Sequence, residues 1–291
     1  MKRKVDSDKI FDFIIYSLAV VILLIILYPL IFVVSASLSD PNSVVSGKVW
    51  LTPINFTLRA YEETFKSASI MTGYKNTIIY TFVGTFINMV MTIMAAYPLS
   101  KPDLKGRNFL MILITFTMFF SGGMIPSFLN IKDLGLYDSM WAMVLPGAIN
   151  VTNLIIVKNY FQNYIPKELI EAAEIDGYSN IGILFNVVLP LAKPILAVIT
   201  IYYMVSHWNS YFSALIYLRD QSKYPLQIFL RQILLQNQVG DMGTGDSVSN
   251  IMLYETLKYA VIIVSSVPVL IIYPFFQKFF QKGIMMGSVK G

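Results

Sequence analysis

The feature that most constrains this chain is a series of long apolar segments that, apart from basic residues near their ends, contain no charged residue. The first, Phe13 to Ala36, covers about 24 residues, enough for an α-helix to cross the roughly 30 Å hydrocarbon core of a bilayer. Five more lie near Tyr74–Leu99, Phe109–Phe128, Met140–Val157, Pro194–Leu218 and Leu257–Phe276. Helices that are apolar on every side must face lipid or one another. The sequence therefore predicts an all-α integral membrane protein with six transmembrane helices.

Composition supports lipid as the solvent and excludes several kinds of chemistry. Of 291 residues, 56% are hydrophobic and only 13% are charged, about half the charged share of soluble domains. The chain has no cysteine and a single histidine, His207, so we expect no metal site. It also lacks the phosphate-binding loop and the nucleophile and zinc-protease motifs of common hydrolases. We therefore expect no catalytic residues, and the scattered basic residues argue against nucleic acid as a partner.

The distribution of lysine and arginine predicts the orientation. Basic residues cluster before the first span, between spans two and three, between spans four and five, and after span six. The positive-inside rule then places these segments and both termini in the cytoplasm. The segments 37–73, 129–139 and 219–256 fall outside, the last with a glycine-rich stretch at 240–245. Two of them are long, which indicates either a docking surface or a folded cap.

The loop between spans four and five predicts a short helix of about three turns. Pro166 suits a first helical position, and the negative charge of Glu168 is stabilised by the positive end of the helix dipole. Gly177 suits the left-handed conformation that ends a helix. Ala172 and Ala173 would let another surface approach the backbone closely. A helix that couples to a partner and a solvated amphipathic connector are both compatible with these signals.

The same loop resembles a known family. Three residues separate Glu171-Ala172-Ala173 from Gly177, and nine more separate Gly177 from Val187-x-Leu189-Pro190. This spacing matches the EAA loop of the membrane subunits of bacterial ABC importers, with Val187 in place of the usual isoleucine. The resemblance covers roughly 72–278 and implies a MetI-like, type I importer fold. The extra first span, the tail from Gly283 and the His207-Trp208-Asn209 segment resemble carbohydrate permeases of the maltose-permease type, especially their LplC/YtcP-like branch in Gram-positive bacteria.

This resemblance implies a function, partners and a domain division. It implies a permease subunit in a bacterial cell membrane that forms half of a pathway for an oligosaccharide or related carbohydrate. The implied partners are a second permease subunit, two ATPase subunits that bind ATP and Mg²⁺ in place of this chain, and an extracellular solute-binding protein. Residues 1–71 would hold the first span and an external segment, 72–278 the core with the EAA loop at about 164–190, and 279–291 a cytoplasmic tail. The residues implied to couple to the ATPase are Glu168, Glu171, Ala172, Ala173, Gly177, Leu189 and Pro190.

Span five is the most polar membrane segment. Tyr202, Ser206, Asn209 and Ser213 recur at helical spacing, with His207 beside them. Hydroxyls, amides and aromatic faces are what a sugar requires, so this face is a candidate pathway lining. The alternative is that these groups bond neighbouring helices.

Two other spans contain breaks. Pro146-Gly147, followed by Asn150 and Asn153, interrupts span four, and Ser121-Gly122-Gly123 lies in span three. Freed backbone groups in a bilayer need partners in protein or a watery cavity. We therefore add Asn150 and Asn153 to the candidate pathway; the breaks are either gates or fixed kinks.

Two other functions remain open at this point. A self-sufficient secondary carrier is disfavoured because the spans hold no intramembrane carboxylate and the sequence shows no inverted repeat. An ABC permease for a non-sugar solute would keep the mechanism and change only the cargo.

Overall fold

The computed structural model describes residues 3–239 and 248–287, and side-chain environments for 9–235 and 255–277. Every regular element among these residues is a helix, which confirms the predicted all-α fold. The glycine-rich stretch at 240–245 and the end of the tail at 288–291 lie outside the described residues.

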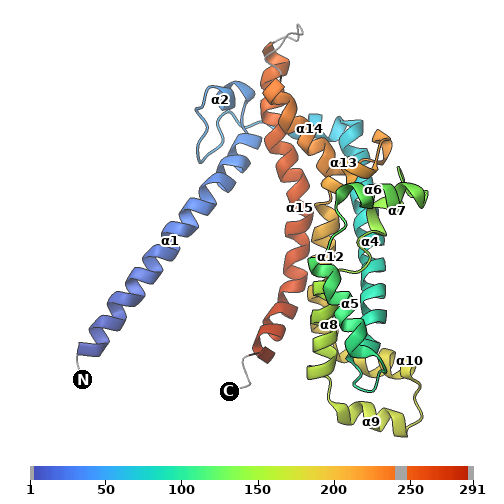
Figure 1. Ribbon diagram of the computed structural model, residues 1–291. Coiled ribbons are helices and arrows are strands. Elements are labelled where there is room, and N and C mark those ends of the chain that lie inside the picture. Colours follow the sequence, from blue (N-terminus) through green and yellow to red (C-terminus); the bar gives the residue numbers. More distant parts are fainter. Residues whose placement is uncertain (1–2, 240–247, 288–291) are drawn as a thin grey trace. The chain divides into compact units, whose positions relative to one another are not determined.

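Figure 1 shows the helices in the order in which they follow one another along the chain. In chain order they are α1 (Arg3–Ser37), α2 (Pro41–Val45), α3 (Arg59–Lys66), α4 (Ala68–Ser100), α5 (Arg107–Phe119), α6 (Met124–Asp133), α7 (Met140–Val144), α8 (Val151–Tyr164), α9 (Lys167–Ile175), α10 (Asn180–Ile183), the π-helical turn η1 (Leu184–Val188), α11 (Leu189–Leu191), α12 (Lys193–Trp208), α13 (Phe212–Tyr217), the 3₁₀ turn η2 (Gln221–Lys223), α14 (Leu226–Val239) and α15 (Val248–Gly287).

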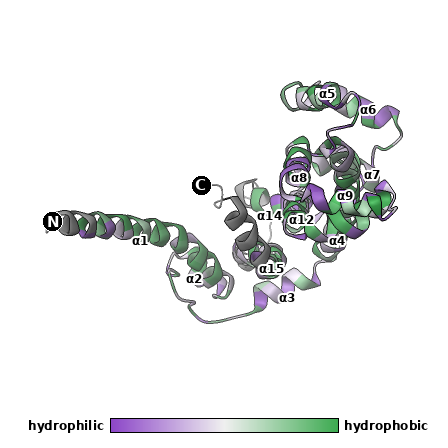
Figure 2. Cartoon of the chain, turned by 90° about the horizontal axis from the view of Figure 1, so that it is seen from below, coloured by the Kyte–Doolittle hydropathy of each residue, from purple (hydrophilic) through white to green (hydrophobic). Residues whose placement is uncertain are grey.

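Three of the predicted spans are continuous helices. Within α1, α4 and α15, the stretches Lys9–Ser37, Ala68–Ser100 and Glu255–Gln277 are each long and apolar enough to cross a membrane. In Figure 2 much of α1 has the green of hydrophobic residues, and none of the residues in the most apolar stretch of that helix is buried within the chain. A helix of this kind requires lipid or another chain around it.

The other predicted spans are divided. Between α5 and α6 the chain bends by 114°, and between α11 and α12 by 83°. Span four is split into α7 and α8, and span five continues past α12 into α13. The described residues thus hold three spanning helices, or up to five if each bent pair counts as one span, so the count of six stays a prediction. Span three is divided where predicted: Gly123, at φ +89°, lies just before α6.

The chain divides into two compact units. The first combines residues 1–70 with 230–267, and the second combines 71–229 with 268–291. In the first, the segment after α1 is folded: Ser39 Oγ donates to the Ser35 carbonyl at 2.6 Å and accepts the Ile54 N–H at 3.0 Å. Part of the predicted external segment 37–73 is therefore structured.

The second unit contains two apolar clusters. One joins the end of α4 to α8, α9, η1 and α12 through side chains such as Ala96, Leu154, Ala173, Val188 and Ile199, all buried. The other joins α4, α7, α13 and the start of α14 through Tyr80, Val144, Ala214 and Ile228. These clusters fix the elements that carry the candidate site.

Candidate functional site

The EAA loop forms a helix that ends as the sequence predicts. Gly177 has φ +80°. Its N–H donates to the Glu174 carbonyl at 3.1 Å and the Tyr178 N–H donates to the Ala173 carbonyl at 3.0 Å, the bond pattern of a Schellman motif. The start differs by one residue: Pro166 is the N-cap of α9 rather than its first helical residue, because its ψ of 130° is extended.

One side of α9 is anchored and the other is free. Ala173 is 7% exposed and packs in the first apolar cluster. Glu168, Glu171 and Ala172 are exposed, which leaves their side chains available to another chain. The small side chain of Ala173 lets α9 lie close to the elements it packs on.

A compact turn-rich segment links α9 to the membrane helices. Ser179 caps α10 by accepting the Gly182 N–H at 3.2 Å, and η1 and α11 lead into the bend before α12. Val188 is buried, Leu189 packs at the edge of the same cluster, and Pro190 lies in α11. Leu189 and Pro190, predicted for coupling, thus lie between α9 and α12 and not on the exposed surface of α9.

The second unit also contains a polar cavity of about 500 Å³. Its walls come from α4, α7, the α7–α8 break, α8, α12 and α13. The polar lining residues are Asn88, Asn150, Asn153, Tyr202, Tyr203, Ser206, His207, Ser210, Ser213 and Tyr217. All of the predicted pathway residues except Asn209 are in this lining.

Asn209 is placed elsewhere because α12 ends one residue before it. Its side-chain amide donates back to the Val205 carbonyl at 2.9 Å, and the side chain is exposed. The helical spacing that grouped it with Tyr202 and Ser206 stops there. Ser213 reaches the cavity from the next helix, α13.

A hydrogen-bond chain holds the cavity wall together. The His207 Nε2 and Asn88 Oδ1 atoms lie 2.6 Å apart, and because the amide oxygen only accepts, the imidazole donates. Asn88 Nδ2 in turn donates to the Gly147 carbonyl at 2.5 Å. The Tyr203 hydroxyl accepts the Asn150 N–H at 3.2 Å. Two backbone groups freed by the α7–α8 break therefore have protein partners.

Sequence reasoning missed the contribution of α4. Thr77, Thr81, Thr85, Asn88 and Thr92 recur every three or four residues along this apolar helix, and all are buried. Such a stripe predicts one polar face turned toward protein. Thr92 Oγ1 lies 2.8 Å from the Tyr203 hydroxyl, which ties this face to α12.

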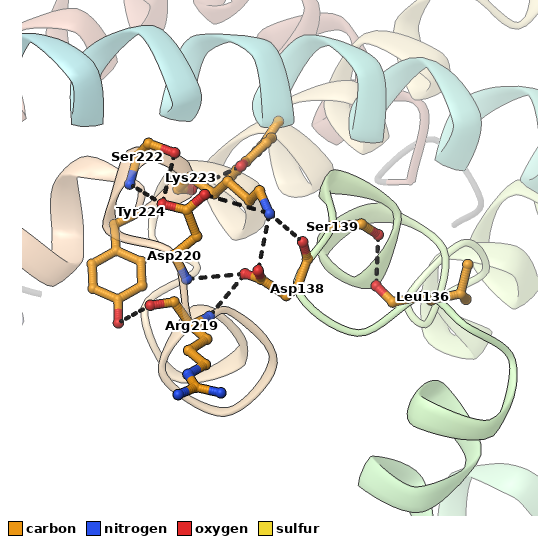
Figure 3. Close-up of polar contacts among 9 residues, drawn as sticks. Leu136, Asp138, Ser139, Arg219, Asp220, Ser222, Lys223 and Tyr224 are labelled. Carbon is orange, nitrogen blue, oxygen red and sulfur yellow. Dashed lines mark hydrogen bonds and ion pairs between the residues drawn. The ribbon is translucent and has the colours of Figure 1, made fainter.

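A second polar cluster lies where the α6–α7 loop meets the α13–α14 loop (Figure 3). Asp138 Oδ1 accepts the N–H groups of Arg219 at 2.9 Å and Asp220 at 3.0 Å. Lys223 Nζ donates to Asp138 Oδ2 at 2.9 Å, and Asp220 Oδ1 accepts the Ser222 N–H at 2.9 Å. We call Asp138, Arg219, Asp220, Ser222 and Lys223 the Asp138 cluster.

The electrostatics of this cluster are strongly complementary. The two backbone N–H groups, followed by the Lys223 ammonium, lower the pKa of Asp138 to about 2. Hydrogen bonding to Asp138 raises the pKa of Lys223. Asp138 itself has φ +53°, a conformation that aspartate tolerates better than most residues. The two loops are thus joined by a charged contact whose partners both stay ionised near neutral pH.

The structure contains no candidate metal centre among its described residues: no three histidine, aspartate or glutamate side chains gather there as a metal site would require. The chemistry of the cavity is that of neutral hydroxyls and amides.

Comparison with known proteins places these features in a family. Residues 67–286 match the family model described as "Binding-protein-dependent transport system inner membrane component". The chain is 46% identical over 290 residues to the Polygalacturonan/rhamnogalacturonan transport system permease protein YtcP of Bacillus subtilis (strain 168), covering 98% of this chain and 100% of the relative. It is 42% identical to Protein LplC of the same organism, covering 92% and 90%.

Comparison with solved structures supports the same family. The chain superposes with a TM-score of 0.87, at 38% identity, on a chain from the crystal structure of a bacterial ABC transporter involved in the import of the acidic polysaccharide alginate, covering 94% of this chain and 98% of that one. A chain from the alginate transporter bound to its periplasmic protein gives a TM-score of 0.62 at 18% identity, which supports the fold alone.

Proposed function

The chain belongs to the binding-protein-dependent transport system inner membrane component family, and on this premise we propose that it is a permease subunit of an ABC importer for an oligosaccharide or related carbohydrate. The name of one relative above describes a transport system permease protein for polygalacturonan and rhamnogalacturonan, and the description of a solved structure specifies import of alginate. Those substrates belong to those proteins; for this chain they define the class to test first.

The observation that carries the proposal is a polar cavity and an exposed helix joined through one packed core. Ala173 of α9 and Tyr203 of the cavity wall belong to the same apolar cluster. A displacement of α9 would therefore be transmitted through η1 and α12 to the cavity as a rigid-body movement. This is the arrangement that coupling between an ATPase and a substrate pathway requires.

The partners and the orientation belong to the same proposal. Glu168 and Glu171 would meet basic groups on an ATPase subunit, with ATP and Mg²⁺ bound by that subunit and no cofactor bound by this chain. A second permease subunit would complete the pathway, and an extracellular binding protein would deliver substrate. The EAA loop and both termini would then lie on the cytoplasmic side.

The cavity suits a sugar by its chemistry. Asn153 offers an amide, Ser206 and Ser213 offer hydroxyls, and Tyr202, half exposed, offers an aromatic face. Hydrogen bonds from such groups replace those that sugar hydroxyls make with water, and the lining contains no lysine or arginine. Recognition within the membrane would thus rest on neutral donors and acceptors.

Uptake by a deletion strain tests the function directly. We expect the strain to lose uptake of one glycan in a panel that includes neutral and uronate oligosaccharides, and the wild-type gene to restore it. Loss of peptide or ion uptake with every glycan unaffected would contradict the assignment to carbohydrate.

A matched pair of variants tests the cavity. Asn153→Ala should raise the KM for that glycan, because Asn153 lines the cavity. Asn209→Ala removes the same side chain from outside it and should leave the KM unchanged. Equal effects of the two variants would remove the cavity from the pathway.

A further inference from the structure

A second large pocket lies at the end of α4, beside the EAA segment and away from the polar cavity. It has a volume of about 540 Å³ and is lined by Tyr97, Pro98, Lys101, Asp103, Leu104, Lys105, Asn180, Ile181 and Leu184. The topology proposed above puts it at the cytoplasmic surface of the bilayer, and in that respect the inference below rests on the proposed function.

The polar side of this pocket is basic. Lys101 and Lys105 outnumber the single lining carboxylate, Asp103. The Lys101 ammonium bonds Asn180 Oδ1, lies 5.3 Å from the centre of the Tyr97 ring, and approaches Glu174 Oε1 only to 3.9 Å. Its nearest carboxylate is thus beyond a close hydrogen bond.

An unsatisfied donor supplies a second, independent observation. Tyr97 is 8% exposed, and its hydroxyl is buried without a hydrogen-bond partner. A buried hydroxyl left unpaired is costly, and the great majority of such groups have a partner. Tyr97 lines the pocket, so a ligand oxygen that reaches this hydroxyl from the pocket would provide one.

The remaining wall is apolar and partly open. Leu104 and Leu184 line the interior, while Ile181 is 69% exposed. A free inorganic anion gains nothing from such a surface, whereas a lipid presents a phosphate joined to glycerol and acyl carbons. Basic pockets at the cytoplasmic side of membrane helices suit anionic headgroups.

We propose that this pocket binds the headgroup phosphate of an anionic phospholipid from the cytoplasmic leaflet. Lys101 and Lys105 neutralise the phosphate, the Tyr97 hydroxyl donates to one of its oxygens, and Ile181 and Leu104 contact the glycerol and upper acyl carbons.

Occupancy of the pocket would act on the coupling helix. Lys101 is the residue that links the end of α4 to both Asn180 and Glu174, and Glu174 belongs to α9. A phosphate that attracts Lys101 weakens its contact with Glu174. The anionic lipid content of the membrane would thereby regulate how α9 is held.

The test counts bound lipid. The complex, purified with its own partners, is placed in nanodiscs of phosphatidylcholine containing phosphatidylglycerol, and retained phosphatidylglycerol is measured by native mass spectrometry. The Lys101→Gln/Lys105→Gln variant should retain at least roughly tenfold less than the wild type. Lys132→Gln, an exposed lysine of α6, is the matched control and should retain the wild-type amount.

Additional variants and conditions distinguish lipid binding from a loss of folding and from an effect of free phosphate. Lys105→Gln alone and Tyr97→Phe should each reduce retention while the complex stays assembled, which excludes a general loss of structure. In pure phosphatidylcholine, ATPase stimulation should differ from that in phosphatidylglycerol, and added inorganic phosphate should not reproduce the difference.

Three results would overturn the proposal: equal retention by wild type and double variant, equal loss in Lys132→Gln, or full replacement of the lipid effect by inorganic phosphate. Because retention is measured without transport, it is independent of the glycan-uptake test. A chain that binds lipid without importing sugar would refute only the proposed function.

Discussion

At the scale of single residues, Asp138 connects two loops far apart in the sequence through charge rather than packing. Its carboxylate accepts two backbone N–H groups and faces the Lys223 ammonium. Tyr80 adds a bond from α4 to the Lys223 carbonyl at 2.8 Å. The α13–α14 loop is thereby held from two sides.

The pH dependence of the Asp138 cluster follows from the direction in which the pKa of Asp138 is shifted. The folded-state pKa of Asp138 is about 2, below its usual 3.8. The contribution of the ionised carboxylate to folding stability is therefore fully present at any pH above the pKa in the unfolded chain. It is lost only as the pH falls from about 4 toward 2. We therefore expect hydrogen exchange in the α13–α14 loop to show no titration of this carboxylate between roughly pH 5 and pH 8.

Asp138→Asn removes the charge and keeps a side chain that tolerates positive φ. Hydrogen bonds to charged groups contribute about 1.5–3 kcal/mol, so the amides of Arg219 and Asp220 should exchange roughly tenfold faster or more. Asp133→Asn, at the end of α6, is the control. Unchanged exchange in Asp138→Asn would show that the backbone alone holds the loop.

Position 84 requires glycine because the His207 ring packs directly against its Cα. A Cβ built there would lie 2.4 Å from the His207 ring, so Gly84→Ala must displace the imidazole and break its bond to Asn88. Overpacking of this kind costs about 1–3 kcal/mol. The variant complex should therefore unfold at a lower temperature and lose uptake, whereas Gly122→Ala, with its nearest neighbour at 3.9 Å, should do neither. A wild-type melting temperature in Gly84→Ala would contradict the packing.

At the scale of elements, α9 is defined by its end more than by its length. Gly177 has open space around it, so a substitution there is penalised by backbone conformation, by about 1–2 kcal/mol for a left-handed non-glycine residue. Gly177→Leu should leave the complex assembled but lower ATPase-coupled uptake, because the Schellman end sets the direction of α9.

The matched control is Gly135→Leu. Gly135 has φ +70° and equally open surroundings, so the backbone strain is the same while α9 is untouched. Uptake and ATPase stimulation should then differ between the two variants even where their melting temperatures agree. Normal coupling in Gly177→Leu would exclude this glycine from the mechanism.

At the scale of the whole molecule, the topology remains a prediction that labelling can test. The chain has no cysteine, so single cysteines report without background. In intact cells, Ser46→Cys, which is exposed after α2, should react with an impermeant thiol reagent. Asp103→Cys, exposed beyond α4, should react only after the membrane is permeabilised. The opposite pattern would invert the orientation and move the lipid pocket to the outer leaflet.

The sequence alone determined the features that depend on the chemistry of neighbouring residues and on the length of apolar segments. The membrane class followed from uncharged apolar runs, and the end of α9 followed from Gly177, because only a left-handed residue permits the bonds of that motif. The resemblance carried by Glu171, Ala172, Ala173 and Gly177 is confirmed by the family match.

Tertiary structure decided what depends on contacts between distant segments. It placed Asn209 outside the cavity because α12 ends at Trp208, a boundary that apolar periodicity does not mark. It brought Asn88 against His207 across 119 residues, and it joined Asp138 to Arg219. The alternation of side chains along one helix specifies a face, but what that face meets is set only when other helices pack against it.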